Sequence, residues 1–190
     1  MKRLVFGITG ASGAPYAARA LEFLRADGSV HVDVIFTKTG RVVWNHEVGT
    51  DPAGYGFPIW NPGDFTAPFA SGSARVDGML VLPCSAGSAG RIAHGLSTDL
   101  VGRAADVTLK ERRPLVLVVR EMPLSLIHLR NLTQLAEAGA TVLPASPGFY
   151  HKPQSVRDLV DHVVARALDR VGIDNELFRR WSGLGDSDGD

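Results

Sequence analysis

The sequence contains a single cysteine, Cys84, among its 190 residues. One cysteine excludes a disulfide within the chain and a cysteine-rich metal site. No charge is in excess either, because 20 lysines and arginines balance 20 aspartates and glutamates. The chain therefore has no global field that favours nucleic acid or an acidic membrane. The six histidines include no pair at metal-ligand spacing, and we expect no catalytic metal.

Long hydrophobic runs are also missing. No stretch reaches the roughly 18 apolar residues that a bilayer-spanning helix needs, so we expect no membrane association. The apolar segment after Met1 is too short for a secretion signal and no small-residue cleavage site follows it, so we expect a cytoplasmic protein. The length predicts one domain, residues 1–181. The acidic, glycine-rich residues 182–190 predict a disordered tail.

Glycine is abundant, with 21 residues, and the apolar segments alternate between strand and helix patterns. The pattern predicts strands at 4–8, 30–36, 78–83, 115–119 and 141–143, and helices at 14–25, 40–47, 89–94, 98–111, 123–138 and 155–171. Residues 48–69 are rich in glycine and proline and predict an ordered loop or lid. The alternation predicts an α/β, doubly wound, Rossmann-like fold: a mainly parallel sheet with helices on both faces.

Polar or glycine-rich segments follow four of the predicted strands, at 9–13, 37–40, 84–88 and 120–121. In doubly wound sheets ligands bind beyond the carboxyl ends of the strands, so we expect these segments to build the ligand site.

The first segment, within residues 7–13, is a strand–turn–helix glycine loop that presents backbone N–H groups at a helix start. The spacing of Gly7 and Gly10 does not match the dinucleotide fingerprint, and a P-loop is excluded because no Gly-Lys-Ser/Thr occurs. Generic phosphate binding and a plain turn both remain open. The segment 84–88 adds two hydroxyls and further N–H groups for a small polar ligand, while Cys84 is expected to be a buried, inert thiol.

Charged residues gather on two further segments. Arg103 and Lys110 stand two turns apart on a predicted helix with Asp106 between them, which fits either a solvated ion-paired face or an anion site. Arg120 and Glu121 follow the most apolar predicted strand. At this position an arginine can bind a phosphate through two hydrogen bonds, and a glutamate can donate a proton. A structural ion pair remains the alternative there.

Five segments together resemble the UbiX-type flavin prenyltransferases over nearly the whole chain, from Lys2 to about Trp181. They are residues 9–13, 68–73, 103–113, 120–129 and 147–153. The resemblance implies a flavodoxin-like homo-oligomer, typically a dodecamer, that binds FMN without metal. It implies transfer of a dimethylallyl group from dimethylallyl monophosphate to N5 and C6 of reduced FMN, giving prenylated FMN for a UbiD-type decarboxylase.

The resemblance also implies roles for individual residues. Those that would hold FMN are Gly10, Ala11, Ser12, Thr37, Ser85, Ala86, Gly87, Ser88 and Arg120. Those that would bind the prenyl phosphate are Lys110, Tyr150 and Arg166, with Arg103 in support, and Phe65 would line the prenyl pocket. Glu121 would act as the acid/base, Ser12 would assist proton movement, and Lys110 would stabilise the leaving phosphate.

Other functions remain open. An FMN-dependent cysteine decarboxylase shares the fold, but the Pro-Ala-Ser-Ala-Asn loop typical of such enzymes is missing. A non-catalytic FMN-binding redox module would not need Lys110, Tyr150 and Arg166 together. A short-chain dehydrogenase is disfavoured because no Tyr-x-x-x-Lys motif follows the glycine loop.

Overall fold

The structure, a computed structural model, describes residues 1–183. Most of the predicted tail, residues 184–190, lies outside the described residues. The fold is a parallel sheet of six strands in the order β3-β2-β1-β4-β5-β6. The strands are β1 (Lys2–Ile8), β2 (Val30–Phe36), β3 (Ile59–Trp60), β4 (Gly78–Cys84), β5 (Leu115–Val119) and β6 (Thr141–Pro144).

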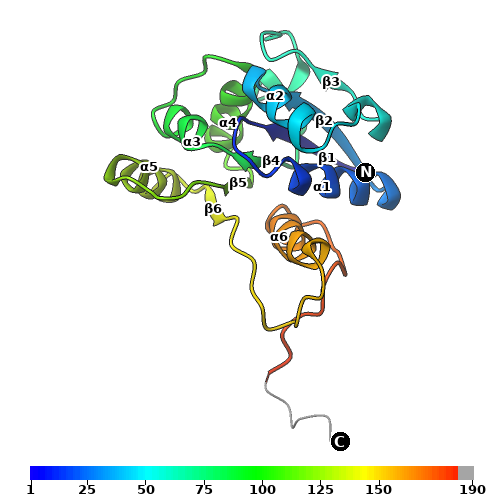
Figure 1. The fold of residues 1–190 in the computed structure, drawn as a ribbon. Helices are drawn as coiled ribbons and strands as arrows, with labels where there is room; N and C mark the ends of the chain where they lie inside the picture. The colour runs from blue at the N-terminus through cyan, green and yellow to red at the C-terminus, as the bar shows by residue number, and fades with distance from the viewer. Residues whose placement is uncertain (184–190) are drawn as a thin grey trace, which may run out of the picture.

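Helices cover both faces of the sheet, as Figure 1 shows. They are α1 (Ala14–Asp27), α2 (Lys38–Glu47), α3 (Ala86–Ala93), α4 (Leu100–Lys110), α5 (Leu126–Glu137) and α6 (Val156–Arg170). Two short 3-10 helices, η1 (Pro52–Tyr55) and η2 (Pro68–Ala70), lie in the connection between β2 and β4. The predicted doubly wound α/β fold is confirmed.

The hydrophobic core consists of two clusters of buried residues, one on each face of the sheet. Alternate strand residues point to opposite sides of a sheet, so Phe6 and Leu80 pack with α1 and α6, whereas Val5 and Met79 pack with α3 and α4. In Figure 1, α6 accordingly lies on the opposite side of the sheet from α4. Side chains on α4 and α6 of one chain are therefore separated by the sheet.

The predicted loop at 48–69 needs a correction. The segment contributes β3, which pairs with β2 at the edge of the sheet, as well as most of the two 3-10 turns. The indole N–H of Trp60 donates to the buried carboxylate of Asp33 at 2.9 Å, and its ring meets Phe69 edge-on at 5.5 Å. These contacts hold the segment against the sheet, so it is ordered as predicted, and the edge strand is the part that was missed.

Several predicted helix starts were also wrong, because polar side chains cap the helices at other residues. Thr37 and Ser85 accept the N–H groups of Gly40 and Ser88, so α2 and α3 begin earlier than predicted. Ser125 caps α5, so Pro123 precedes this helix instead of lying in its first turn. The predicted cap of the last helix is confirmed: Ser155 and Asp158 form a reciprocal capping box.

Candidate functional site

The polar segments after β1, β2 and β4 lie side by side at the carboxyl edge of the sheet. The N–H of Thr37 donates to the carbonyl of Ile8 at 2.9 Å and ties the second segment to the first. The buried hydroxyl of Thr9 donates to the carbonyl of Pro83 and accepts the N–H of Ser85, both at 2.8 Å. The sheet thus brings together Gly10, Ala11, Ser12, Thr37 and Ser85 to Ser88, as the strand ends predict.

Arg120 and Glu121 join this edge from β5. The N–H of Arg120 donates to the carbonyl of Cys84 at 3.2 Å, and its guanidinium Nε donates to the carbonyl of Ser12 at 3.0 Å. Glu121 is exposed, and its carboxylate accepts the N–H of Met122 at 3.1 Å. Arg120 therefore bridges to the glycine loop, while Glu121 remains open to a ligand.

The glycine loop does not present all of its backbone N–H groups unpaired at the start of α1, as the sequence analysis expected. Gly13 has φ +120, a conformation that favours glycine. The N–H groups of Gly13 and Ala14 both donate to Glu47 Oε2 at 2.8 Å, so a carboxylate already occupies the start of α1. The N–H groups of Gly13 and Ala14 are thus used within the chain, which at these two residues favours the plain turn over phosphate binding.

Glu47, the last residue of α2, belongs to the site and was missed by the sequence analysis. Burial raises the pKa of its carboxyl, but hydrogen bonds from Ser12, Gly13 and Ala14 and the charge of Arg120 lower it more, and the net pKa lies below the ordinary value. Glu47 is thus an anion held against Ser12 and Arg120. Gly13 and Ala14 lie more than 30 positions before Glu47, and no sequence signal pairs them with it. The one local feature of Glu47 is its position at the end of a predicted helix.

The start of α3 carries donors that fit an anion. The Ser85 hydroxyl accepts the N–H of Ser88, and Arg91 Nη2 donates to the Ser88 hydroxyl at 3.1 Å. Gly87 is exposed, and a Cβ there would meet only the Arg91 guanidinium at 3.8 Å, which leaves the approach open. Hydroxyls, a guanidinium and a helix start are the donor set that binds phosphate groups. Arg91 was missed by the sequence analysis.

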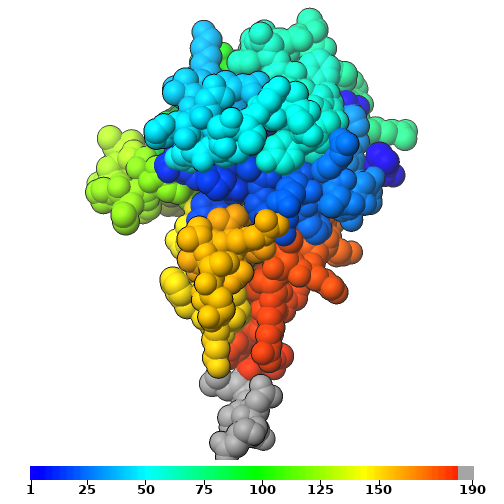
Figure 2. All heavy atoms as spheres, turned by 45° about the vertical axis from the view of Figure 1, so that its right-hand side comes forward, coloured from blue at the N-terminus to red at the C-terminus, as the bar shows by residue number. Residues whose placement is uncertain are grey.

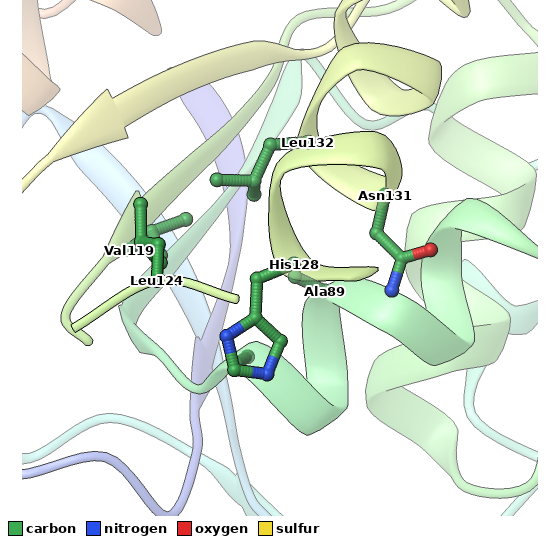
Figure 3. Close-up of a pocket in the computed structure, with 7 residues that line it drawn as sticks. Ala89, Val119, Leu124, His128, Asn131 and Leu132 are labelled. Carbon is green, nitrogen blue, oxygen red and sulfur yellow. The ribbon is translucent and has the colours of Figure 1, made fainter. Parts of the chain in front are cut away.

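A small hollow lies beside this edge, between α3 and α5 (Figure 3). Ala89 of α3 and Val119 of β5 line it together with Leu124, His128 and Leu132. His128 also caps its own helix, since its Nδ1 accepts the N–H of Ser125 at 3.3 Å. The hollow is an apolar junction that supports the loops, and His128 is a capping residue of α5.

The cations of α4 do not reach this edge within one chain. Arg103 Nε donates to the carbonyl of Ala70 at 2.9 Å and its Nη1 pairs with Asp106 at 3.3 Å. Lys110, the last residue of α4, pairs with Glu111 instead of Asp106. Because β5 begins at Leu115, Lys110 lies toward the amino edge of the strands, away from Ser12.

Tyr150 and Arg166 form a third group around α6. The Tyr150 hydroxyl lies 3.2 Å from His162 Nε2, and Arg166 pairs with Asp169 at 3.4 Å. Figure 2 shows α6 and the segment after it projecting beyond the body of the molecule. Phe65, which is 48% exposed, lies apart from them between β3 and η2. One chain therefore leaves the predicted site residues in separate groups.

Cys84 is confirmed as a buried thiol. It is fully buried at the end of β4, and burial raises its pKa to about 12. A thiol of such high pKa carries almost no thiolate at neutral pH, so Cys84 is not a nucleophile. Among residues 1–183, no three metal-binding side chains cluster, and no helix is long and apolar enough to cross a membrane.

Comparison with known proteins places this geometry in a family. The profile of the family described as Flavoprotein matches residues 1–168. The flavin prenyltransferase UbiX of Synechocystis is 46% identical, covering 95% of this chain and 96% of the relative. The protein of the same name from Methanothermobacter thermautotrophicus is 41% identical, covering 96% and 97%. The chain belongs to the UbiX-type flavin prenyltransferases.

Solved structures agree with this membership. The crystal structure of AnUbiX, in complex with FMN and dimethylallyl pyrophosphate, has a TM-score of 0.92 and 42% identity, covering 96% of this chain and 98% of that one. A dodecameric FMN-dependent UbiX-like decarboxylase from Escherichia coli has a TM-score of 0.92 and 43% identity, covering 95% and 100%. The cysteine decarboxylase SpaF, with a TM-score of 0.61 and 21% identity over 76% of this chain and 84% of that one, shares the fold alone.

Proposed function

We propose that this chain is a flavin prenyltransferase that joins the dimethylallyl group of dimethylallyl monophosphate to N5 and C6 of reduced FMN. The observation that carries the proposal is the match along nearly the whole chain to AnUbiX, whose structure contains FMN and dimethylallyl pyrophosphate. No metal is part of this proposal. Residues 1–181 act as one flavin-binding domain, supported by the family match over residues 1–168 and by the packing of α6 on α1.

The carboxyl edge of the sheet holds FMN. The residues assigned to it are Gly10, Ala11, Ser12, Thr37, Ser85, Ala86, Gly87, Ser88 and Arg120. The hydroxyls and helix start at Ser85 and Ser88, with Arg91 beside them, have the chemistry of a phosphate site. When bound, reduced FMN supplies the nucleophilic ring that accepts the prenyl group.

Ser12 and Glu47 form a hydrogen-bonded pair that can relay a proton at this edge of the sheet. The Ser12 hydroxyl donates to the carboxylate of Glu47, whose negative charge is stabilised by Arg120 and by the N–H groups of the α1 start. Glu47 therefore stays ionised and orients the Ser12 hydroxyl, so Ser12 can pass a proton at the mouth of the sheet. Glu121, exposed next to Arg120, acts as the acid/base beside the leaving phosphate.

The prenyl phosphate is held by cations from more than one subunit. Lys110 and Arg103 lie on α4, while Tyr150 and Arg166 lie at α6 on the opposite face of the sheet. One phosphate can contact both groups only if different copies supply them, and the dodecameric relative shows that this fold assembles. Several cations stabilise the phosphate as the allylic C–O bond breaks. Phe65 adds an aromatic wall to the prenyl pocket, next to the flavin.

The use of the product, the oligomeric state and the location of the enzyme complete the proposed function. The prenylated FMN serves as the cofactor of a partner decarboxylase of the UbiD type. The enzyme works as a homododecamer in the cytoplasm, where its charged phosphate substrates are retained, because charged groups cross apolar barriers poorly.

The test is an anaerobic incubation of the protein with reduced FMN and dimethylallyl monophosphate, followed by a mass spectrum of the released flavin. We expect a flavin heavier by one prenyl unit. An unchanged flavin mass with both the monophosphate and the pyrophosphate donor would refute the proposal. Formation of a decarboxylated product from cysteine-ended peptides instead would favour the decarboxylase alternative.

Glu121→Gln tests the acid/base role. The exposed carboxylate accepts the N–H of its neighbour Met122, a contact that an amide oxygen can keep, so the variant is expected to fold and to bind FMN with unchanged affinity. Loss of a proton donor lowers the single-turnover rate by about 10²–10⁴-fold. Single-turnover kinetics equal to those of the wild type would remove Glu121 from the mechanism.

A further inference from the structure

Tyr150 is held by a cluster of rings from two parts of the chain. Its ring meets His162 of α6 and Trp181 edge-on, each at 5.6 Å between centroids, and Phe178 at 6.5 Å. Even so, Tyr150 is 46% exposed. The ring is therefore fixed from one side while the other side is open to a ligand.

His162 contacts two polar groups of the loop that carries Tyr150. His162 is 8% exposed. The N–H of Gly148 donates to His162 Nδ1 at 3.3 Å, and the Tyr150 hydroxyl lies 3.2 Å from His162 Nε2. One buried imidazole thus connects α6 to both ends of the Gly148–Tyr150 turn.

These contacts decide where the imidazole proton lies. A backbone N–H can only donate, so Nδ1 is the acceptor, and a neutral ring then carries its proton on Nε2. The Nε2–H donates to the Tyr150 oxygen. The phenolic proton of Tyr150 consequently points away from His162 and is free for another acceptor.

The surroundings keep His162 neutral. Burial, followed by the charges of His151 and Arg166, lowers the pKa of His162 below the ordinary histidine value. His151 stacks on it at 5.1 Å between centroids with planes 2° apart. Other charged groups near the cluster include Asp158 and Lys152, beside His151, Arg179, beside Phe178, and Arg180, over the Phe178 ring. A second proton on Nδ1 would face the Gly148 N–H, so protonation would break the contact.

We infer that His162 is a positioning residue that orients the Tyr150 hydroxyl as a hydrogen-bond donor to the phosphate of the prenyl substrate. The inference rests on the proposed function. A tyrosine hydroxyl can donate or accept, and a phosphate dianion offers only acceptors. Because His162 donates to the Tyr150 oxygen, the Tyr150 O–H cannot point toward the imidazole. It is therefore oriented toward the phosphate before the substrate binds.

The kinetic test compares His162→Phe with His162→Gln. Phenylalanine keeps a ring but loses both polar contacts, whereas glutamine offers an oxygen to Gly148 N–H and an amide N–H to Tyr150. We expect His162→Phe to raise the KM for dimethylallyl monophosphate about tenfold, in line with one lost hydrogen bond to a charged group. His162→Gln should recover most of this loss, and the Kd for FMN should stay unchanged in both variants.

A double-variant comparison separates orientation from general packing. If His162 acts through the Tyr150 hydroxyl, His162→Phe adds no further increase in KM once Tyr150→Phe is present. An equal fold increase in both backgrounds, or an unchanged KM in His162→Phe, would overturn the inference. Wild-type protein that forms no prenylated flavin would instead overturn the proposed function, so the two failures are distinct.

A neutron structure of the wild-type protein gives a readout that needs neither a variant nor activity. We expect hydrogen on His162 Nε2, no hydrogen on Nδ1, and the Tyr150 phenolic hydrogen pointing away from the imidazole. Hydrogen on Nδ1, or a Tyr150 O–H donated to His162, would contradict the inference.

Discussion

At the scale of single residues, Glu47 shows how a side chain can serve both fold and site. Its carboxylate caps α1 through Gly13 and Ala14, and the same group accepts the hydroxyl of Ser12. The cap stabilises the glycine loop at the place where Ser12 must be presented. A charge change at Glu47 should therefore alter stability and activity together.

Glu47→Gln tests this double role. The neutral amide loses the favourable interaction with the helix start, which costs about 1 kcal/mol and lowers Tm by about 2–4 °C. Since folding lowers the pKa of Glu47, its contribution is fully present above the ordinary glutamate pKa and disappears as pH falls through the lowered value. The Tm difference between wild type and variant should thus shrink in acid.

Thermal unfolding at neutral and acidic pH measures the effect, with Glu137→Gln as the matched control, because Glu137 is exposed at the end of α5. The control should leave Tm within experimental scatter. A Tm difference for Glu47→Gln that stays constant from neutral to strongly acidic pH would contradict the proposed cap.

Cys84 yields a chemical prediction. Because burial raises its pKa to about 12, the native protein should resist alkylation by iodoacetamide at neutral pH. Denatured protein should be labelled at its one cysteine, which serves as the positive control. Rapid labelling of the folded protein, followed by mass spectrometry, would show that the thiol is accessible and would reopen a nucleophilic role.

At the scale of elements, those that depend on local sequence signals could be predicted, whereas those that depend on long-range contacts could not. The carboxyl-edge segments were predictable because strand ends and the glycine loop can be read locally. The edge strand β3 was not, because it has two residues in a glycine- and proline-rich segment and depends on Trp60 contacting Asp33 and Phe69. Glu47 was missed for the same reason: its partners lie far away in the chain.

The start of α2 depends on a close approach that requires glycine. A Cβ at Gly40 would overlap the carbonyl oxygen of Ile8, a backbone atom that cannot move aside easily. Gly40→Ala should therefore destabilise the fold by about 1–3 kcal/mol and weaken FMN binding, because Thr37 caps the same helix.

Gly54→Ala is the matched control. Gly54 is exposed in η1 and a Cβ there would meet no atom within 4 Å. The control should leave the urea midpoint and the FMN affinity unchanged. Equal urea midpoints for Gly40→Ala and the wild type would show that the contact of α2 with β1 has room for a Cβ.

At the scale of the whole molecule, the arrangement of cations is the decisive feature. Lys110 lies at the end of α4 and Arg166 on α6, on opposite faces of the sheet. The family resemblance named both residues, but the sequence carries no signal of which subunit supplies each one. We propose that each prenyl phosphate is held by Lys110 of one subunit and by Tyr150 and Arg166 of another.

Co-expression of Lys110→Ala and Arg166→Ala variants tests this claim most directly, with the yield of prenylated flavin per subunit as the measurement. Each variant alone should lose about 10²–10³-fold in rate. In mixed assemblies about a quarter of the sites regain both side chains, so about a quarter of wild-type product formation should return.

The control replaces the Arg166→Ala partner by a chain that carries both substitutions, which can supply no Lys110 and should restore nothing. Return of about a quarter of the activity only with the complementary pair is the predicted result. Mixed assemblies that form no more prenylated flavin than either variant alone would contradict the claim that the site is shared between subunits.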